Sequence, residues 1–205
     1  MKTIVSIAVL AAVLSAPDLL AAPPPPHCGV LAGYDYTNGE NREYLSRVEQ
    51  HHFTPNVEAL RSGNSATIGG ELSYTLMMFP NHHRALAALG NFTLKEKTLK
   101  PYGAKYSVEC FFDRAIRFKP TDAMVRMVYG NYLLKAGQTD KATEQLQMAA
   151  DLQPENPTIN YNLGLLYVQK KDYEQARTYA KKAYELDFPL PGLKNQLIKA
   201  GKWED

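Results

Sequence analysis

The chain has 205 residues, of which 45% are hydrophobic and 21% are charged. This composition is sufficient for a folded unit with an apolar core, and it excludes a chain that is disordered throughout. The chain contains 23 lysines and arginines and 21 aspartates and glutamates, so its net charge is +2. A near-neutral balance argues against a protein that binds nucleic acid through many phosphate contacts.

The N-terminus has the pattern of a secretory signal. A basic start precedes an apolar run from Ile4 to Leu14. This run has about half of the ~20 residues that a membrane-spanning helix needs. With the small residues that follow, it predicts a signal peptide over residues 1–22 and a periplasmic protein, while an uncleaved membrane anchor is the alternative. The prolines of residues 23–27 predict a stiff spacer, and no later stretch is long and apolar enough to span a membrane.

Cys28 and Cys110 are the only cysteines in the chain. In an exported protein an even count predicts a disulfide, which here would strap an N-terminal arm across the outer face of the fold. Two free thiols in a reducing compartment are the alternative. Lipid attachment to Cys28 is disfavoured because Pro26 and His27 occupy positions where small residues are needed.

Between residues 123 and 189 similar residues recur every 34 positions. The recurring pairs are Gly130 and Gly164, Ala142 and Ala176, Leu146 and Ala180, and Ala149 and Ala183. Each unit is predicted to form two helices, joined by turns at residues 136–138 and 170–172. A glycine on the first helix opposite an alanine on the second lets the two backbones approach closely, and Pro154 ends the first unit.

This pattern resembles the tetratricopeptide repeat, except that Arg126 and Asn160 stand where a tryptophan is usual. The resemblance implies an all-α fold, a right-handed α-solenoid of helix pairs with an N-terminal helical extension. It also implies a non-catalytic scaffold that holds a protein or peptide partner in its concave groove and uses no cofactor. We expect one repeat over residues 121–155 and a second over residues 156–189.

A degenerate unit is expected over residues 81–120, because Phe112, Ala115 and Pro120 lie 34 positions before Leu146, Ala149 and Pro154. Its first helix is expected near residues 81–94, with Ala87 and Ala88 at the close contact. Its connecting loop has about eight extra residues. Residues 190–205 should form a capping helix, which solenoids need for solubility.

Residues 28–80 show no repeat register. We expect helices over residues 42–51 and 56–61 and a loop rich in glycine and serine over residues 62–70, while residues 71–79 are ambiguous. The combination of Cys28, the histidine pairs at 51–52 and 82–83 and the segment at 108–112 resembles a group of small exported tetratricopeptide proteins of proteobacteria. That resemblance implies export and the repeat fold, and no activity.

Four of the five histidines form two adjacent pairs, His51 with His52 and His82 with His83. Histidine is a common metal ligand, so a metal-binding protein or metal-dependent enzyme is an alternative function. Adjacent helical residues point about 100° apart, so only one of each pair could share a site. The other interpretation is that these side chains pack, cap helices or remain in solvent.

The expected partner groove is lined by first-helix residues. The candidates are Met127, Asn131, Lys135, Tyr161, Asn162 and Gln169. Clamp-type tetratricopeptide domains use inner-face asparagines to bind a terminal carboxylate, and this chain resembles them partially, since Met127 replaces the expected lysine. Met127 either lines the groove or is buried between repeats. A structural subunit that assembles through tyrosine-rich faces is a further alternative.

Export makes a direct prediction for the mature chain. If the signal is removed, the protein should begin near Ala22 and should partition with the periplasm. Intact-mass spectrometry of the purified protein measures this N-terminus. Soluble cytoplasmic protein that retains Met1 would contradict the prediction.

Overall fold

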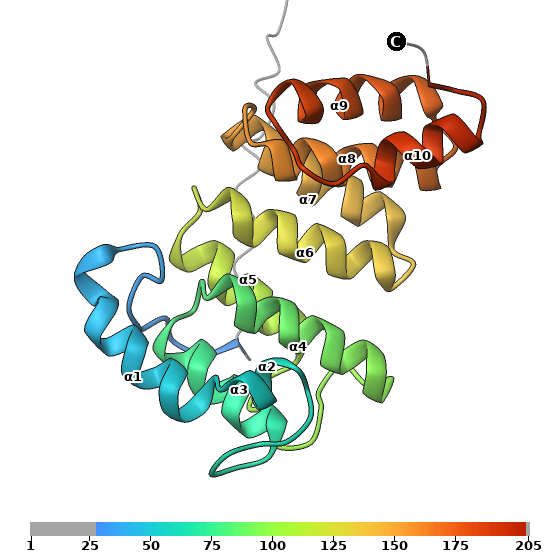
Figure 1. Cartoon of the computed structure of the whole chain (residues 1–205). Coiled ribbons are helices and arrows are strands. Elements are labelled where there is room, and N and C mark those ends of the chain that lie inside the picture. Colours follow the sequence, from blue (N-terminus) through green and yellow to red (C-terminus); the bar gives the residue numbers. More distant parts are fainter. Residues whose placement is uncertain (1–27, 204–205) are drawn as a thin grey trace, which may run out of the picture.

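The computed structural model describes residues 28–203, and all regular structure in this range is helical (Figure 1). The predicted all-α solenoid is therefore confirmed for this part of the chain. The expected signal peptide over residues 1–22 and the spacer over residues 23–27 lie outside the described residues. No helix among those described is long and apolar enough to cross a membrane.

The helices follow one another in stacked, roughly antiparallel layers from the N-terminal arm to the C-terminus (Figure 1). Their bounds are η2 Gly39–Asn41, α1 Arg42–His52, α2 Pro55–Glu58, α3 Ile68–Met78, α4 His83–Glu96, α5 Val108–Phe118, α6 Ala123–Lys135, α7 Thr139–Leu152, α8 Pro157–Gln169, α9 Tyr173–Glu185 and α10 Gly192–Lys199.

Helices α6 and α7 form one tight pair, and α8 and α9 form another, as the 34-residue period predicts. Asp122 and Asn156 cap the first helix of each pair by accepting hydrogen bonds from backbone N–H groups of the first turn. A Cβ atom on Gly130 would lie 2.6 Å from the Leu146 Cγ and 3.3 Å from the Ala142 carbonyl oxygen. Glycine is therefore required for this approach of the two helices.

Gly90 places helix α4 in register with α6 and α8, whereas Ala87 and Ala88 were expected at the close contact. Gly90 is the eighth residue of α4, as Gly130 and Gly164 are of α6 and α8. A Cβ atom on Gly90 would lie 3.1 Å from the Tyr132 ring of α6, and α4 contacts α6 more extensively than it contacts α5. The closest approach of α4 is thus to α6 of the next unit at Gly90, instead of to α5 of its own unit at Ala87 and Ala88. The long α4–α5 loop lets α5 lie farther from its partner.

Helix α3 continues the repeat register into the segment where none was expected. Leu72 lies eight residues before Pro80, as Phe112 and Leu146 lie before Pro120 and Pro154, and all three side chains are fully buried. Helix α3 begins at Ile68, inside the segment predicted as a loop, and covers the ambiguous residues 71–78. It packs against both α1 and α4, so the N-terminal extension adds a further helix pair to the stack.

The eleven-residue loop between α4 and α5 (residues 97–107) lies on α3. A Cβ atom on Gly69 would collide with the Tyr102 carbonyl oxygen, so this position requires glycine. The Lys105 N–H donates to the Ser73 Oγ at 2.9 Å, and the Val108 N–H donates to the Leu99 carbonyl at 2.9 Å. These bonds at both ends fix the loop.

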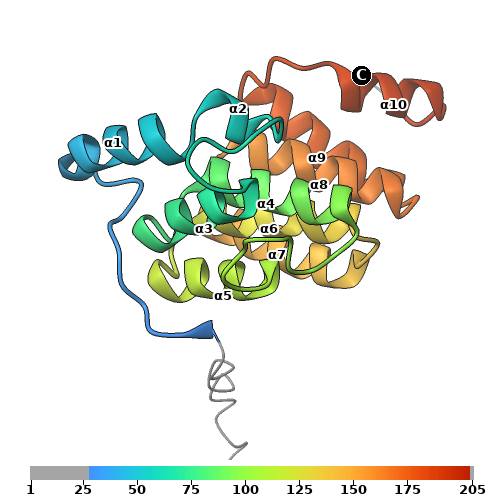
Figure 2. The same ribbon diagram turned by 90° about the horizontal axis from the view of Figure 1, so that it is seen from below.

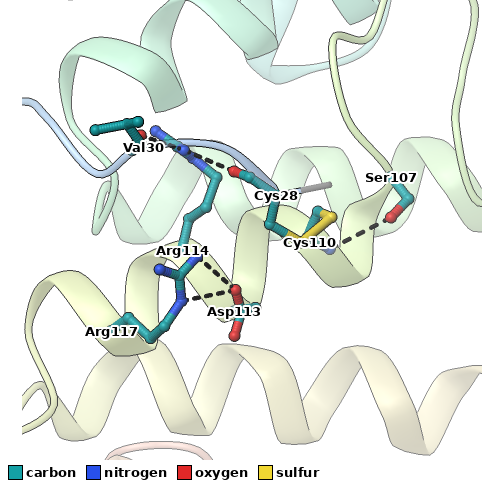
Figure 3. The surroundings of a disulfide bond; sticks show 7 residues. All are labelled: Cys28, Val30, Ser107, Cys110, Asp113, Arg114 and Arg117. Carbon is teal, nitrogen blue, oxygen red and sulfur yellow. Dashed lines mark hydrogen bonds and ion pairs between the residues drawn. A yellow bond between two sulfur atoms is a disulfide. The ribbon is translucent and has the colours of Figure 1, made fainter. Parts of the chain in front are cut away.

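The N-terminal arm, residues 28–38, leads to η2 and α1 (Figure 2). Covalent and polar contacts tie it to the solenoid (Figure 3). Cys28 forms a disulfide with Cys110 of α5. The Arg114 guanidinium, which is 1% exposed, donates from Nη1 to the Cys28 carbonyl at 2.8 Å and to the Val30 carbonyl at 2.7 Å. The buried side chain thus uses the arm's backbone to satisfy part of its hydrogen-bonding capacity.

Helix α10 covers the last helix pair. Its Leu193 and Leu197 are buried against Ala176 and Ala180 of α9. The Leu193 side chain also occupies the space beside Gly164, where a Cβ atom would collide with it. The terminal helix therefore uses the glycine of α8 as a packing site, which explains why the end of the stack needs this position to be small.

Gly164→Leu should destabilise the fold by about 1–3 kcal/mol or more, because the new side chain would overpack the contacts with Leu193 and with the Ala176 backbone. Lys171→Leu is the matched control, since Lys171 is exposed in the α8–α9 turn. Thermal unfolding followed by circular dichroism measures both variants. Equal melting temperatures would show that the helix register is wrong.

Candidate functional site

A pocket lies between the first helices of two successive units, α4 and α6. It is lined by Ala87, Gly90, Asn91, Val128, Asn131, Tyr132 and Lys135. Asn91 and Asn131 each follow the glycine of their helix directly, so they occupy equivalent positions one unit apart. The repeat itself therefore places two amide side chains along one groove.

The floor of the pocket is set by Tyr132. Its ring lies against α4 because Gly90 has no side chain, and only 6% of the residue is exposed. The ring also stacks with Phe112, at a centroid distance of 5.7 Å. Burial raises the pKa of Tyr132, while a hydrogen bond with Thr93 acts in the opposite direction. The phenol therefore stays neutral at physiological pH and forms a packed, aromatic floor.

The rim of the pocket offers hydrogen-bond donors. The Lys135 Nζ donates to the Asn91 Oδ1 at 3.1 Å, which leaves the Asn91 amide N–H groups for other partners. No hydrogen bond joins the Asn131 side chain to another residue within 28–203. None of the lining residues is acidic. The arrangement can bind carbonyl or carboxylate oxygens above an apolar floor.

The helices that form the pocket are held together at their N-terminal ends by a buried polar cluster. Asp122 caps α6 and accepts a hydrogen bond from the Asn81 Nδ2 at 2.9 Å, and its carboxylate lies 2.9 Å from the His83 Nε2 of α4. Burial raises the pKa of Asp122, but the bonds to His83, Asn81 and the backbone outweigh burial and lower it overall. An ionised Asp122 thus fixes α4 relative to α6.

The structure brings only two of the predicted groove residues, Asn131 and Lys135, into this pocket. Met127 is buried, with 6% exposure, so the interpretation that it packs between repeats holds. The Asn162 Nδ2 donates to the Thr158 carbonyl of its own helix at 2.8 Å. Its amide is therefore already partnered, and it does not extend the row that Asn131 begins.

The remaining two groove candidates lie elsewhere. Tyr161 stacks on Phe188 at a centroid distance of 4.1 Å, and a Cβ atom on Gly192 would lie 2.8 Å from its hydroxyl. The segment that leads into α10 therefore covers Tyr161. Gln169 is exposed at the C-terminal end of α8, outside the pocket.

The 34-residue period does not predict Asn91, the polar side chain that α4 adds to the pocket. Residues 89–92 (Leu-Gly-Asn-Phe) correspond to residues 129–132 (Tyr-Gly-Asn-Tyr), forty positions later. The two segments are forty positions apart, so the 34-residue period does not align them. The long α4–α5 loop is the reason that the spacing differs.

The histidines form separate pairs with carboxylates instead of one cluster. His52 Nδ1 lies 2.7 Å from a Glu71 oxygen, and His82 Nε2 lies 3.1 Å from a Glu49 oxygen. His51 is exposed. Among residues 28–203, no three side chains of histidine, cysteine, aspartate or glutamate gather as metal ligands would.

His82 caps α4 in its neutral form. Its Nδ1 accepts a hydrogen bond from the Ala85 N–H at 3.2 Å, so its proton is on Nε2, which donates to Glu49. Burial lowers the pKa of His82 to about 3, and the positive charges of Arg84 and His83 act in the same direction. His82 therefore serves as the N-cap that Asp122 and Asn156 provide in the next two units.

Comparison with known proteins identifies the repeats. Residues 129–188 match the tetratricopeptide repeat family. A solved structure described as the functional characterization of Pseudomonas aeruginosa pilF aligns over 78% of this chain and 69% of its own, with 23% identity and a TM-score of 0.54. The crystal structure of MamA aligns over 80% and 84% of the two chains, with 20% identity and a TM-score of 0.48. No curated protein sequence matches the chain. The chain thus contains tetratricopeptide repeats in a fold shared with pilF.

The neutral His82 predicts a pH-dependent stability. Between pH 6.5 and 5 the unfolded chain binds a proton at this residue and the folded chain does not. The free energy of unfolding should therefore fall as the pH is lowered, by up to about 1.4 kcal/mol for each pH unit. His82→Asn retains a capping oxygen, as Asn156 does in α8, and should flatten this dependence. Urea unfolding at several pH values measures the slope.

Exposed His51 supplies the control for this measurement, because His51→Asn removes a histidine without changing a buried contact. If the His82 and His51 variants keep the same slope as the parent protein, His82 is not buried in the neutral form.

Proposed function

We propose that the protein is a non-catalytic scaffold that binds an extended segment of a partner protein in the groove between α4 and α6. One observation carries the proposal: Asn91 and Asn131 occupy the same position on successive helices, beside Lys135 and above the Tyr132 ring. Tetratricopeptide repeats form extended surfaces of this kind, on which each unit contributes similar positions.

The mechanism follows from the chemistry of the rim. An extended peptide carries carbonyl oxygens at regular intervals, and amide donors at a regular spacing can bind them. The Lys135 ammonium would favour a partner with an acidic side chain or a terminal carboxylate at this point. Because Asp122 and His83 fix the two helices before binding, little conformational entropy is lost when the partner docks.

We also propose that the protein is exported and works in the periplasm. The sequence pattern of residues 1–22 motivates this proposal, and the disulfide between Cys28 and Cys110 is consistent with an oxidising compartment. The bond would keep the N-terminal arm on α5 where no cytoplasmic reductant opens it.

Replacing both groove asparagines tests the proposed function. Asn91→Ala combined with Asn131→Ala should weaken partner binding by about 1–3 kcal/mol, or roughly five- to 150-fold, because two hydrogen bonds to the partner are lost. Partners captured from periplasmic extract by the parent protein would be identified, purified and titrated by calorimetry against each variant. Circular dichroism checks the fold.

Asn162→Ala is the matched control, since the Asn162 amide already bonds to its own helix and lies outside the pocket. His51→Ala controls for the N-terminal extension. If the double variant keeps its affinity for every partner while His51→Ala loses it, the binding surface is the extension and the proposal is wrong.

A further inference from the structure

The loop between α4 and α5 exposes two large apolar side chains. Leu99 is 51% exposed and Tyr102 is 87% exposed. Four exposed lysines surround them in the sequence, namely Lys95, Lys97, Lys100 and Lys105. Glu96 is the only acidic residue within 95–107, so this segment has a net charge of +3. The loop is therefore both apolar and basic at its surface.

Hydrogen bonds hold the backbone of the loop that exposes these two side chains. Pro101 and Ala104 are buried, and the Ala104 N–H donates to the Pro101 carbonyl at 2.9 Å. The Thr67 hydroxyl donates to the Tyr102 carbonyl at 3.4 Å, which holds the backbone of Tyr102 on the start of α3. Since the backbone is held while the side chain points into solvent, Tyr102 cannot be explained as part of the core.

The loop lies at the end of the solenoid opposite α10, next to the segment between α2 and α3 (Figure 1). The Lys95 Nζ donates to the Leu60 carbonyl at 3.4 Å, and the neighbouring Arg61 is exposed. No carboxylate within residues 28–203 forms an ion pair with any of the four lysines. The charges of these four lysines are thus available to an anionic surface.

We propose that this end of the solenoid docks on the surface of an anionic lipid bilayer. Leu99 and Tyr102 would enter the interface, where a tyrosine ring can be buried while its hydroxyl stays with the headgroups. The lysines would lie among the lipid phosphates. All four cations of residues 95–107 are lysines, whose ammonium groups on flexible side chains suit a fluid layer of phosphates better than the fixed geometry of a protein carboxylate.

Vesicle binding tests this proposal. The protein is used as it is purified from the producing cells, and intact-mass spectrometry determines its N-terminus. Every variant is compared with the parent protein that has the same N-terminus. Co-sedimentation at limiting lipid is measured with phosphatidylcholine vesicles with and without phosphatidylglycerol. We expect tighter binding to the anionic vesicles, and we expect this preference to weaken as salt is added.

Two pairs of substitutions locate the surface. Lys97→Gln with Lys100→Gln should weaken binding to anionic vesicles by about five-fold for each lysine, or about 25-fold together. Lys199→Gln with Lys202→Gln removes two exposed lysines at the opposite end and is the matched control. Equal effects of the two pairs, or no preference of the parent protein for anionic vesicles, would overturn the proposal.

A third variant separates a lipid surface from an acidic protein. Leu99→Ser with Tyr102→Ser changes only exposed side chains, so circular dichroism should be unchanged. This variant should bind anionic vesicles several-fold more weakly and should bind soluble polyglutamate as the parent protein does. If the loop lysines support binding to polyglutamate while vesicle binding is absent, the surface recognises an acidic protein and the lipid proposal is wrong.

Discussion

The packing of α4 against α6 at Gly90 is the contact on which the proposed binding site depends. Because Gly90 has no side chain, the Tyr132 ring lies against α4 and closes the floor of the groove. The same contact sets Asn91 and Asn131 side by side along the rim. A larger residue at this position would displace the ring and separate the two helices, so the site and the packing of the N-terminal half of the solenoid share one steric requirement.

A polar boundary between units complements this apolar contact. Asn81 bonds to both Asp35 of the N-terminal arm and Asp122 of α6, and Asp122 also binds His83. The arm is therefore connected to the groove helices through hydrogen bonds, in addition to the disulfide that joins it to α5. The two connections place the arm at two points of the stack. They explain how residues 29–38, which form no helix or strand, are held in one position.

The repeat period predicted α6 to α9 well, because Gly130, Gly164 and the buried alanines are fixed by close helix packing that leaves few choices of residue. It failed at α4 and α3 for a physical reason. The long α4–α5 loop changes the spacing to forty residues, and in α3 Thr75 stands at the position that Ala115 and Ala149 occupy in α5 and α7. Of the site, Asn131 and Lys135 followed from the register, whereas Asn91 did not. Tyr161 was predicted to line the groove, but the segment leading into α10 packs over it. That segment has no repeat pattern, so the period does not predict this contact.

The contact between Gly90 and Tyr132 can be measured directly by nuclear magnetic resonance in solution. The structure places the α protons of Gly90 against the Tyr132 ring, so a strong nuclear Overhauser effect should join these protons. The three heavy atoms nearest the Cβ position of Gly90 all belong to Tyr132, so the strongest effect from Gly90 to a side chain outside α4 should be the one to this ring. A strong effect between Gly90 and α5, with none to Tyr132, would contradict the register and with it the groove.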